Sequence, residues 1–497
     1  MFDSTTRNGI GLSRPVKEGV VAALLGLALG IYVVTVLSFP VKVMPLLVIA
    51  VLFPFAVVIV GDLRRVFLAL ILMDVPFHFD VNLWYRPDIA KLGAVGGLNL
   101  SLSTISLVVL YSLWFGQAVL GQSSRPRPRL RQSLPLTVYT GVAALAMFVA
   151  HDRELSVFQL FLLIQELLLF TYIASAVRTK PDVVFVVIVL LLGVALEGAL
   201  IGGLKFTGFE LSIVGMSTEV DESYRQSARL GGTLGSPNNA SAYFAILLPI
   251  AMSVLLAKVE RWQHWLAVFA FSLGGCALIF TLSRGGWGAF AVGAFIFCWV
   301  TWRRGQLPIS VPLVLGVVGL LLFFVFQDAI VSRLTENDQG AAYSRIPLMY
   351  VALRMIADNP LLGVGPNNFA FRMGEYVPAE LATAWLYTVH NKFLLLWAEI
   401  GPAGLAAFLW FLFSTLRRGW QCCQCGDPLL TPLALGLTAA IAGHMTHMVA
   451  EAFNGRPLTN LLGICAGLLM ALFTIAKQER ENVHRHVQQQ ERRGDYA

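Results

Sequence analysis

One imidazole and two guanidinium groups are the side chains of this sequence best suited to chemistry on a phosphate ester. His390 stands where a polar stretch gives way to an apolar run, Arg345 begins a helical-looking segment upstream, and Arg284 lies in the short sequence SRGG. An imidazole can take a proton at neutral pH. Guanidinium groups bind phosphate oxygens through charge-assisted hydrogen bonds. Together the three could hold a phosphate leaving group while a hydroxyl is activated.

Each of these residues also has a purely structural interpretation. Arg284 could extend from a helix end to lipid headgroups, and His390 could simply end its apolar span. Arg345 and Arg354 could be solvated charges on a helix face, the role that we assign to Arg354. The two glycines after Arg284 favour a functional role, because glycine lets a ligand approach the backbone closely.

The elements that must position these residues are membrane helices. The chain has 497 residues, of which 57% are hydrophobic and only 13% charged, whereas a soluble domain carries about 25% charged residues. The sequence predicts an all-α polytopic membrane protein with about 12 to 14 transmembrane helices. The candidate spans are 20–39, 43–60, 64–78, 100–121, 134–150, 156–177, 182–206, 239–257, 263–282, 286–302, 308–327, 389–416, 430–450 and 457–476. The span 64–78 is short and contains Asp74 and Pro76, so a broken or re-entrant helix is the alternative there.

The distribution of basic residues orients these spans. Cytoplasmic loops of membrane proteins are rich in Lys and Arg, so the net charge of +7 needs no nucleic-acid partner. With the N-terminus inside, alternate loops hold most of the basic residues, among them Arg64, Arg65, Arg125, Arg127, Arg129, Arg131, Arg178, Lys180, Lys258, Arg261, Arg303, Arg304, Arg417 and Arg418. The same alternation puts Arg229, Arg284, Arg345 and His390 outside.

A long polar loop outside contains an amphipathic segment. Ile346–Ala357 reads as a helix that ends before Pro360, because the residue before a proline disfavours helix. Its apolar positions recur every three or four residues, so the segment should lie on the membrane surface. These positions are Ile346, Met349, Tyr350, Leu353 and Ile356.

The combined motifs resemble the signature region of the O-antigen ligase and Wzy-type polymerase superfamily. They are SRIPLMYVALRMIADNPLLGVGPNNF followed by HNKFLLLWAEIG, with SRGGW and RLGGTLGSPNNAS upstream, and the likeness covers about residues 229–416. The resemblance implies a bacterial inner-membrane glycosyltransferase of GT-C-like architecture that is metal-independent and inverting. It implies a glycan on undecaprenyl diphosphate as the donor.

The resemblance also assigns roles residue by residue. Arg284 matches the arginine that binds the lipid diphosphate, Arg345 matches a second arginine on the large periplasmic loop, and His390 matches the histidine that activates the acceptor. We add Arg229 and Asn391 as substrate-binding candidates. The resemblance gives no role to Arg225 or Arg229, and the part played by Arg354 is open.

The expected organisation follows from spans and resemblance together. Residues 1–18 would form a cytoplasmic tail, 19–327 transmembrane helices with short loops, and 328–388 the large periplasmic loop with its amphipathic helix. Residues 389–476 would form the C-terminal transmembrane helices, and 477–497 a basic cytoplasmic tail.

We expect no cofactor and no metal. A metal would need a cluster of outside carboxylates, because magnesium and manganese prefer oxygen ligands. The available carboxylates show no pairing in the sequence; they are Asp80, Asp88, Asp152, Glu154, Glu219, Asp221 and Glu222. Cys422, Cys423 and Cys425 fall in a predicted cytoplasmic loop, where disulfides are rare.

Two classes of function stay open. The first is a glycosyltransferase, acting as a ligase, a polymerase or a protein O-glycosylase. Its partners would be the undecaprenyl-diphosphate-linked glycan, a glycan or lipid A-core acceptor and membrane lipid, with a chain-length regulator as a further candidate. The second is a transporter or flippase for lipid-linked anions, which should place charges near the membrane midplane. The notable Arg and His residues sit at span ends on one side instead. The exception is Glu197, which lies inside a span and which we interpret as a buried polar contact.

Overall fold

A computed structural model describes residues 62–119, 130–208, 212–213, 216–217, 229–306, 345–378 and 386–494. The chain divides into two units, Met1–Asp62 and Leu63–Ala497, and the second is the subject here. The predicted spans 20–39, 43–60 and 308–327 lie outside the described residues, as does Arg225.

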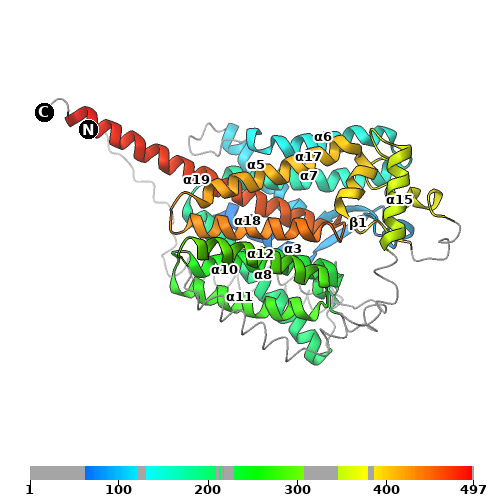
Figure 1. Cartoon of the computed structure of the whole chain (residues 1–497), viewed down its shortest axis with the longest axis horizontal. Coiled ribbons are helices and arrows are strands. Elements are labelled where there is room, and N and C mark those ends of the chain that lie inside the picture. The colour runs from blue at the N-terminus through cyan, green and yellow to red at the C-terminus, as the bar shows by residue number, and fades with distance from the viewer. Residues whose placement is uncertain are drawn as a thin grey trace, which may run out of the picture. The chain divides into compact units, whose positions relative to one another are not determined.

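The described part is a bundle of long helices (Figure 1). They are α3 Leu63–Phe77, α5 Leu102–Val119, α6 Leu130–Ala146, α7 Arg153–Ala176, α8 Lys180–Thr207, α10 Pro237–Leu256, α11 Arg261–Phe280, α12 Arg284–Arg303, α17 Lys392–Cys423, α18 Leu430–His447 and α19 Arg456–Gly494. Within these residues, nine helices are long and apolar enough to cross a membrane. The all-α polytopic membrane fold is therefore confirmed, with most helix ends within a few residues of the predicted ones.

Short elements lie between the long helices. Two small antiparallel sheets pair β1 Asp80–Leu83 with β2 Leu98–Ser101, and β3 Ser212–Ile213 with β4 Met216–Ser217. The remaining pieces are α4 Pro87–Ala90, η2 Met147–Val149, η3 Gly232–Leu234, α15 Arg345–Asp358, α16 Phe369–Arg372 and η4 Met373–Glu375. Figure 1 shows β1 and α15 at one end of the bundle. We call this the outer end, because the sequence assigns its loops to the outside.

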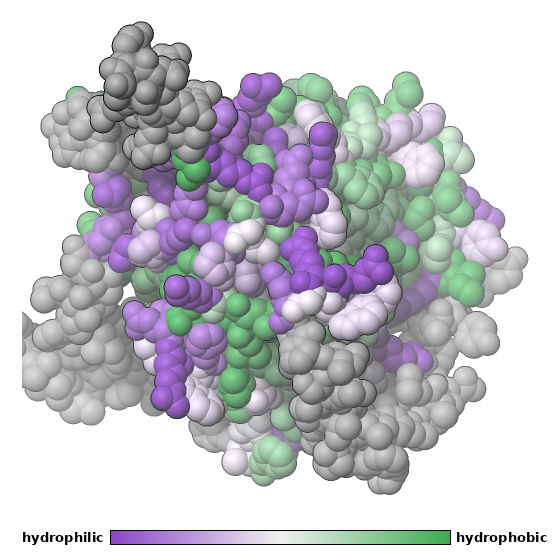
Figure 2. Space-filling model, turned by 60° about the vertical axis from the view of Figure 1, so that its left-hand side comes forward, coloured by the Kyte–Doolittle hydropathy of each residue, from purple (hydrophilic) through white to green (hydrophobic). Residues whose placement is uncertain are grey.

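Loops that the sequence assigns to the cytoplasm gather at the opposite end, which we call the basic end. Arg65 Nη2 lies 3.0 Å from Asp182 Oδ1 and joins the starts of α3 and α8. Lys180 Nζ lies 2.6 Å from Asp427 Oδ2, in the turn between α17 and α18. Figure 2 brings this side of the molecule forward and shows hydrophilic side chains gathered there. The arrangement agrees with the alternation expected from the charges.

The short third span is a continuous helix held by a buried ion pair. Pro76 falls in the last turn of α3, so it ends the helix instead of breaking it. Asp74 is fully buried and accepts hydrogen bonds from Arg456 Nη1 at 2.7 Å and from Ser103 Oγ at 2.6 Å. A buried charge is stable only when it is paired and hydrogen-bonded. The polar residues of this segment therefore join α3 to α5 and to the start of α19.

Helix α17 is interrupted at Gly401–Pro402, and the polar loop fills the interruption. Gly401 has φ 71° and ψ −177°, which is not helical. Because Pro402 has no N–H, the Ala398 carbonyl loses its usual partner within the helix. The backbone N–H groups of Val364 and Gly365 replace such partners, donating to Ala398 O and Glu399 O, both at 2.9 Å. The backbone of residues 363–365, which read GVG, thus docks the polar loop onto α17.

We predict that Gly401→Ala disrupts this docking. An alanine would adopt a left-handed conformation, which costs roughly 1–2 kcal/mol, and its Cβ would overlap with the Leu361 carbonyl oxygen. The midpoint of thermal unfolding of the purified protein should therefore fall by several degrees. Gly141→Ala is the matched control, because Gly141 lies inside α6 with no heavy atom within 4 Å of the added Cβ. Equal unfolding midpoints for the two variants would contradict the account of the interruption.

Candidate functional site

Helix α15 places Arg345 at the outer end. Its buried side packs on α17 and consists of Leu348, Val351, Ala352, Met355 and Ile356. The opposite side exposes a second apolar stripe, made of Ile346, Met349, Tyr350 and Leu353. The segment is thus a helix with the predicted bounds to within a residue. One prediction was wrong: Ile356 lies in the buried stripe, because α17 covers that side of α15.

His390 is held by a carboxylate that the motif analysis did not select. His390 Nδ1 lies 2.8 Å from Glu451 Oε1, and the two side chains are only 9% and 12% exposed. The ring of Tyr387 stacks on the imidazole with the centroids 5.2 Å apart. Glu451 belongs to the turn between α18 and α19, whereas His390 directly precedes α17. The contact therefore joins two segments that are distant in the sequence.

Nearby groups favour the ionised form of Glu451 despite its burial. Burial alone would raise the pKa of this carboxyl, but the hydrogen bond from His390 and nearby positive charge, including that of Arg345, keep the pKa below its ordinary value. A carboxylate can only accept hydrogen bonds. The proton of a neutral His390 is therefore held on Nδ1, which leaves the lone pair on Nε2.

Asn238 and Arg229 extend this contact into a network. Asn238 Nδ2 donates to Glu451 Oε2 at 2.8 Å, while Asn238 Oδ1 accepts from Arg229 Nη2 at 2.8 Å and from Ser283 Oγ at 3.2 Å. Arg229 also donates through Nε to the Thr281 carbonyl at 3.2 Å. The amide of Asn238 thus fixes the second carboxylate oxygen. These contacts hold Arg229 against Asn238 and the Thr281 carbonyl, and its contact with substrate stays a prediction.

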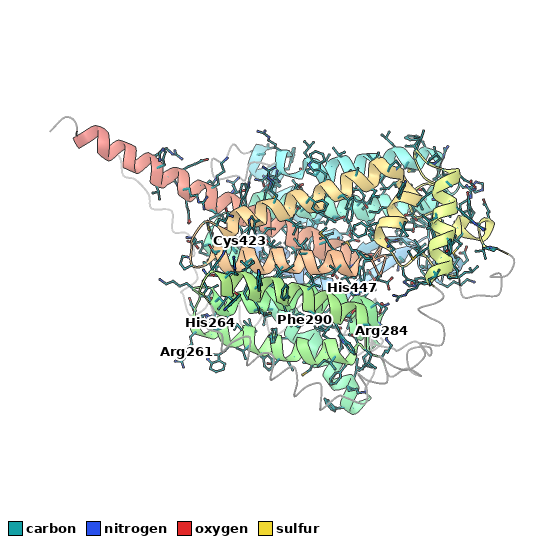
Figure 3. All side chains as sticks on the ribbon, in the orientation of Figure 1. Arg261, His264, Arg284, Phe290, Cys423 and His447 are labelled. Carbon is teal, nitrogen blue, oxygen red and sulfur yellow. The ribbon has the colours of Figure 1, made fainter. Side chains whose placement is uncertain are left out.

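Arg284 begins α12 at the same end of the bundle. It follows the N-cap Ser283 and is exposed, and Figure 3 shows it near the end of α18 that carries His447. A Cβ on Gly285 would come 2.8 Å from His447 Nε2, and one on Gly286 would overlap with Ser241. The two glycines therefore allow α12 to pack against α18 and α10. Helix packing is the close approach that the structure shows at these glycines, and room for a ligand there stays a prediction.

The other candidates of the sequence occupy different positions. Arg345 is half-buried, and its charge acts on both Glu451 and His447. Arg354 is exposed on α15, as expected for a solvated helix face. The Asn391 side chain accepts from the backbone N–H groups of the next two residues of α17 and caps that helix. The structure thus brings Arg345 and His390 to one carboxylate, with Arg284 at the same end, and gives Asn391 a capping role.

Two asparagines hold the polar loop against the rest of the outer end. Asn367 exchanges hydrogen bonds with the Val95 backbone, accepting at 2.8 Å and donating at 2.8 Å. Asn368 does the same with the Asp152 backbone, at 2.8 and 3.0 Å. The GPNNF sequence therefore ties the loop to the segment after β1 and to the start of α7. Its role is structural.

The acidic residues considered as metal ligands are engaged with arginines. Asp80 pairs with Arg456 at 3.3 Å, and Asp152, Asp88 and Glu154 all lie within ion-pair distance of Arg86. Within the described segments, no group of three or more histidines, cysteines or carboxylates is arranged to hold a metal ion. Glu219, Asp221 and Glu222 lie outside these segments.

Sequence reasoning missed Glu451 and Asn238. Glu451 follows the predicted span 430–450, and Asn238 falls within a motif that carried the resemblance. The search was for carboxylates near one another, whereas this carboxylate is near a histidine and an asparagine. The available signal was that Glu451 is a lone charged residue in a short turn between two predicted spans, on the same side as His390.

The comparison with known families was made on the whole chain. Residues 266–409 match the model of the family described as O-antigen ligase. The matched region spans most of α11, all of α12 and α15 and the first half of α17, so it includes Arg284, Arg345 and His390. No match was found among curated proteins. This stretch of the chain is therefore similar to the O-antigen ligase family, and the match supports a polysaccharide-related ligase or polymerase in general terms.

Proposed function

We propose that the protein is an inner-membrane glycosyltransferase. It would move a glycan from undecaprenyl diphosphate to a hydroxyl of an acceptor sugar at the periplasmic face. The acceptor is either a growing glycan, which makes the enzyme a polymerase, or lipid A-core, which makes it a ligase. The observation that carries the proposal is the contact of His390 Nδ1 with Glu451 Oε1 at 2.8 Å, because His390 lies in the segment that matches the ligase family.

The proposed reaction starts at His390 Nε2. This nitrogen takes the proton of the acceptor hydroxyl as its oxygen attacks the anomeric carbon of the donor. The bond from that carbon to the diphosphate oxygen breaks, and undecaprenyl diphosphate leaves with the electron pair. Attack from the face opposite the leaving group inverts the anomeric configuration. Glu451 stabilises the imidazolium that forms and keeps the ring in one orientation.

The two arginines would act on the leaving group. Arg284 and Arg345 lie at the outer end, where a lipid diphosphate would project from the membrane. Their guanidinium groups can bind phosphate oxygens in pairs of hydrogen bonds and stabilise the charge that builds on them. We propose that the reaction needs no metal, because arginines can supply this charge. Two of the carboxylates considered as metal ligands, Asp152 and Asp80, are paired with Arg86 and Arg456.

The role of Glu451 predicts a specific effect of Glu451→Gln. An amide can donate to Nδ1, which would move the lone pair away from Nε2 and leave no base facing the acceptor. Glycan transfer by the purified enzyme should fall by about 10²–10⁴-fold, the usual contribution of general-base catalysis. Glu451→Asp keeps the charge and should retain more activity than Glu451→Gln. Full activity of Glu451→Gln would show that the carboxylate does not orient His390.

Substitutions of the three named residues separate catalysis from folding. His390→Ala, Arg345→Ala and Arg284→Ala should each abolish transfer while the amount of protein in the membrane stays near wild type. Arg284→Lys should recover only part of the activity, since an ammonium group keeps the charge but loses the bidentate geometry. Polymer or ligation product is measured in cells carrying each variant.

Arg354→Ala is the matched control on the same helix as Arg345. Arg354 is exposed on α15, so its removal should change stability by less than about 0.5 kcal/mol and leave most activity. Normal product from His390→Ala cells would end the proposed mechanism. Loss of product from Arg354→Ala cells would show that the functional arginine of α15 was wrongly chosen.

A further inference from the structure

The basic end carries a cavity that the proposed reaction does not use. It has a volume of about 440 Å³ and lies beside the last turns of α17. Its lining residues are Trp410, Phe413, Ser414, Arg417, Arg418 and Gln421. Trp410 and Phe413 are about half exposed. One side of the cavity is therefore aromatic, and the other carries two guanidinium groups beside a hydroxyl and an amide.

A third arginine, on the neighbouring helix, acts electrostatically on one of the arginines of the cavity. Helix α6 packs against α17, and Arg131 lies in its first turn. Arg131 and Arg417 are both close enough to Arg418 for their charges to act unfavourably on it. Arg418 is held in place by a contact of Nη1 with Met470 Sδ of α19 at 3.1 Å. Three like charges are thus concentrated where α6, α17 and α19 meet.

The protein offers these arginines no neutralising partner in the part of the chain that the structure describes. Each ion pair found there involves other cations. The sequence itself contains no Asp or Glu from 120 to 141 or from 404 to 426. Like charges near one another repel, and an anion bound among them relieves that repulsion. The cluster is therefore a favourable place for an anion to bind.

We propose that this cavity binds the headgroup of an anionic phospholipid. The guanidinium groups of Arg131, Arg417 and Arg418 would bind the phosphate oxygens. Trp410 and Phe413 would contact the glycerol and the upper part of the acyl chains, the depth at which aromatic residues concentrate in membranes. Basic pockets between helices on the cytoplasmic side are suited to such lipids. The aromatic side favours an amphiphile over free phosphate.

The test is native mass spectrometry of the detergent-purified full chain with added phosphatidylglycerol or phosphatidylcholine. Wild type should retain phosphatidylglycerol in preference to phosphatidylcholine. Arg417→Gln, an exposed position, should weaken phosphatidylglycerol binding roughly fivefold, and Arg131→Gln/Arg417→Gln roughly 25-fold. Arg303→Gln is the matched control, because Arg303 is also exposed at the basic end and lies over an aromatic ring, that of Trp299, 5.9 Å from its centroid.

Each outcome decides the proposal. Loss of phosphatidylglycerol from the Arg131 and Arg417 variants, with retention by Arg303→Gln, supports it. Unchanged retention by the Arg131→Gln/Arg417→Gln variant overturns it, and so does equal loss in the Arg303→Gln control, which would indicate attraction to general positive charge. Displacement of the lipid by inorganic phosphate would also overturn it, because the site would then bind a free anion. Glycan transfer is not part of this readout, so failure here leaves the proposed function unaffected.

Discussion

The interruption of α17 at Gly401–Pro402 is the constraint on which the outer end depends. A proline in a helix removes one hydrogen bond and leaves a carbonyl exposed, and inside a membrane protein such a group must find another partner. The backbone of Val364 and Gly365 supplies partners to Ala398 and Glu399. Helix α15, which precedes that loop, is thereby packed on the half of α17 that follows His390. Arg345 is held at the outer end as a consequence, where its charge acts on Glu451.

The turn between α18 and α19 provides the second half of the site. It is fixed by contacts on both sides of Glu451. The Lys392 backbone N–H donates to Met448 O at 2.8 Å, and Lys392 Nζ donates to Asn454 Oδ1 at 2.6 Å. On the other side, Arg456 forms its buried ion pair with Asp74 at 2.7 Å. Breaking a buried pair of this kind usually costs 3–5 kcal/mol. Polar groups far from the reaction thus hold the carboxylate that orients His390.

The fold was predictable from the sequence because its main signals are long and repeated. Apolar runs of about 20 residues define spans almost independently of context, and basic loops orient them. The amphipathic helix α15 was also predictable from its spacing, although which stripe would be buried depended on α17. The ion pair of Asp74 with Arg456 was not predictable from the sequence, since it joins residues far apart in the chain.

The candidate site was predictable only in part. Arg284 and Arg345 stood out because arginines on the outer side run against the usual charge bias, and His390 stood out because it begins a span on that same side. Glu451 did not, since one carboxylate in a short turn has no local signature. The glycines after Arg284 were interpreted as room for a ligand, but the close approach is between helices. The glycines themselves indicated a close approach to the backbone at this point. Only the structure shows that the approaching groups belong to neighbouring helices.

The central claim is that this site faces the outside of the cell, where a completed lipid-linked glycan would meet it. Thiol labelling of intact cells with a permeable outer membrane tests it, in a variant without the six native cysteines. Gly374→Cys places an exposed thiol near the site, and Gln421→Cys places one at the basic end. A membrane-impermeant reagent should label Gly374→Cys in intact cells and Gln421→Cys only after lysis. The reverse pattern would put His390 in the cytoplasm and contradict the account.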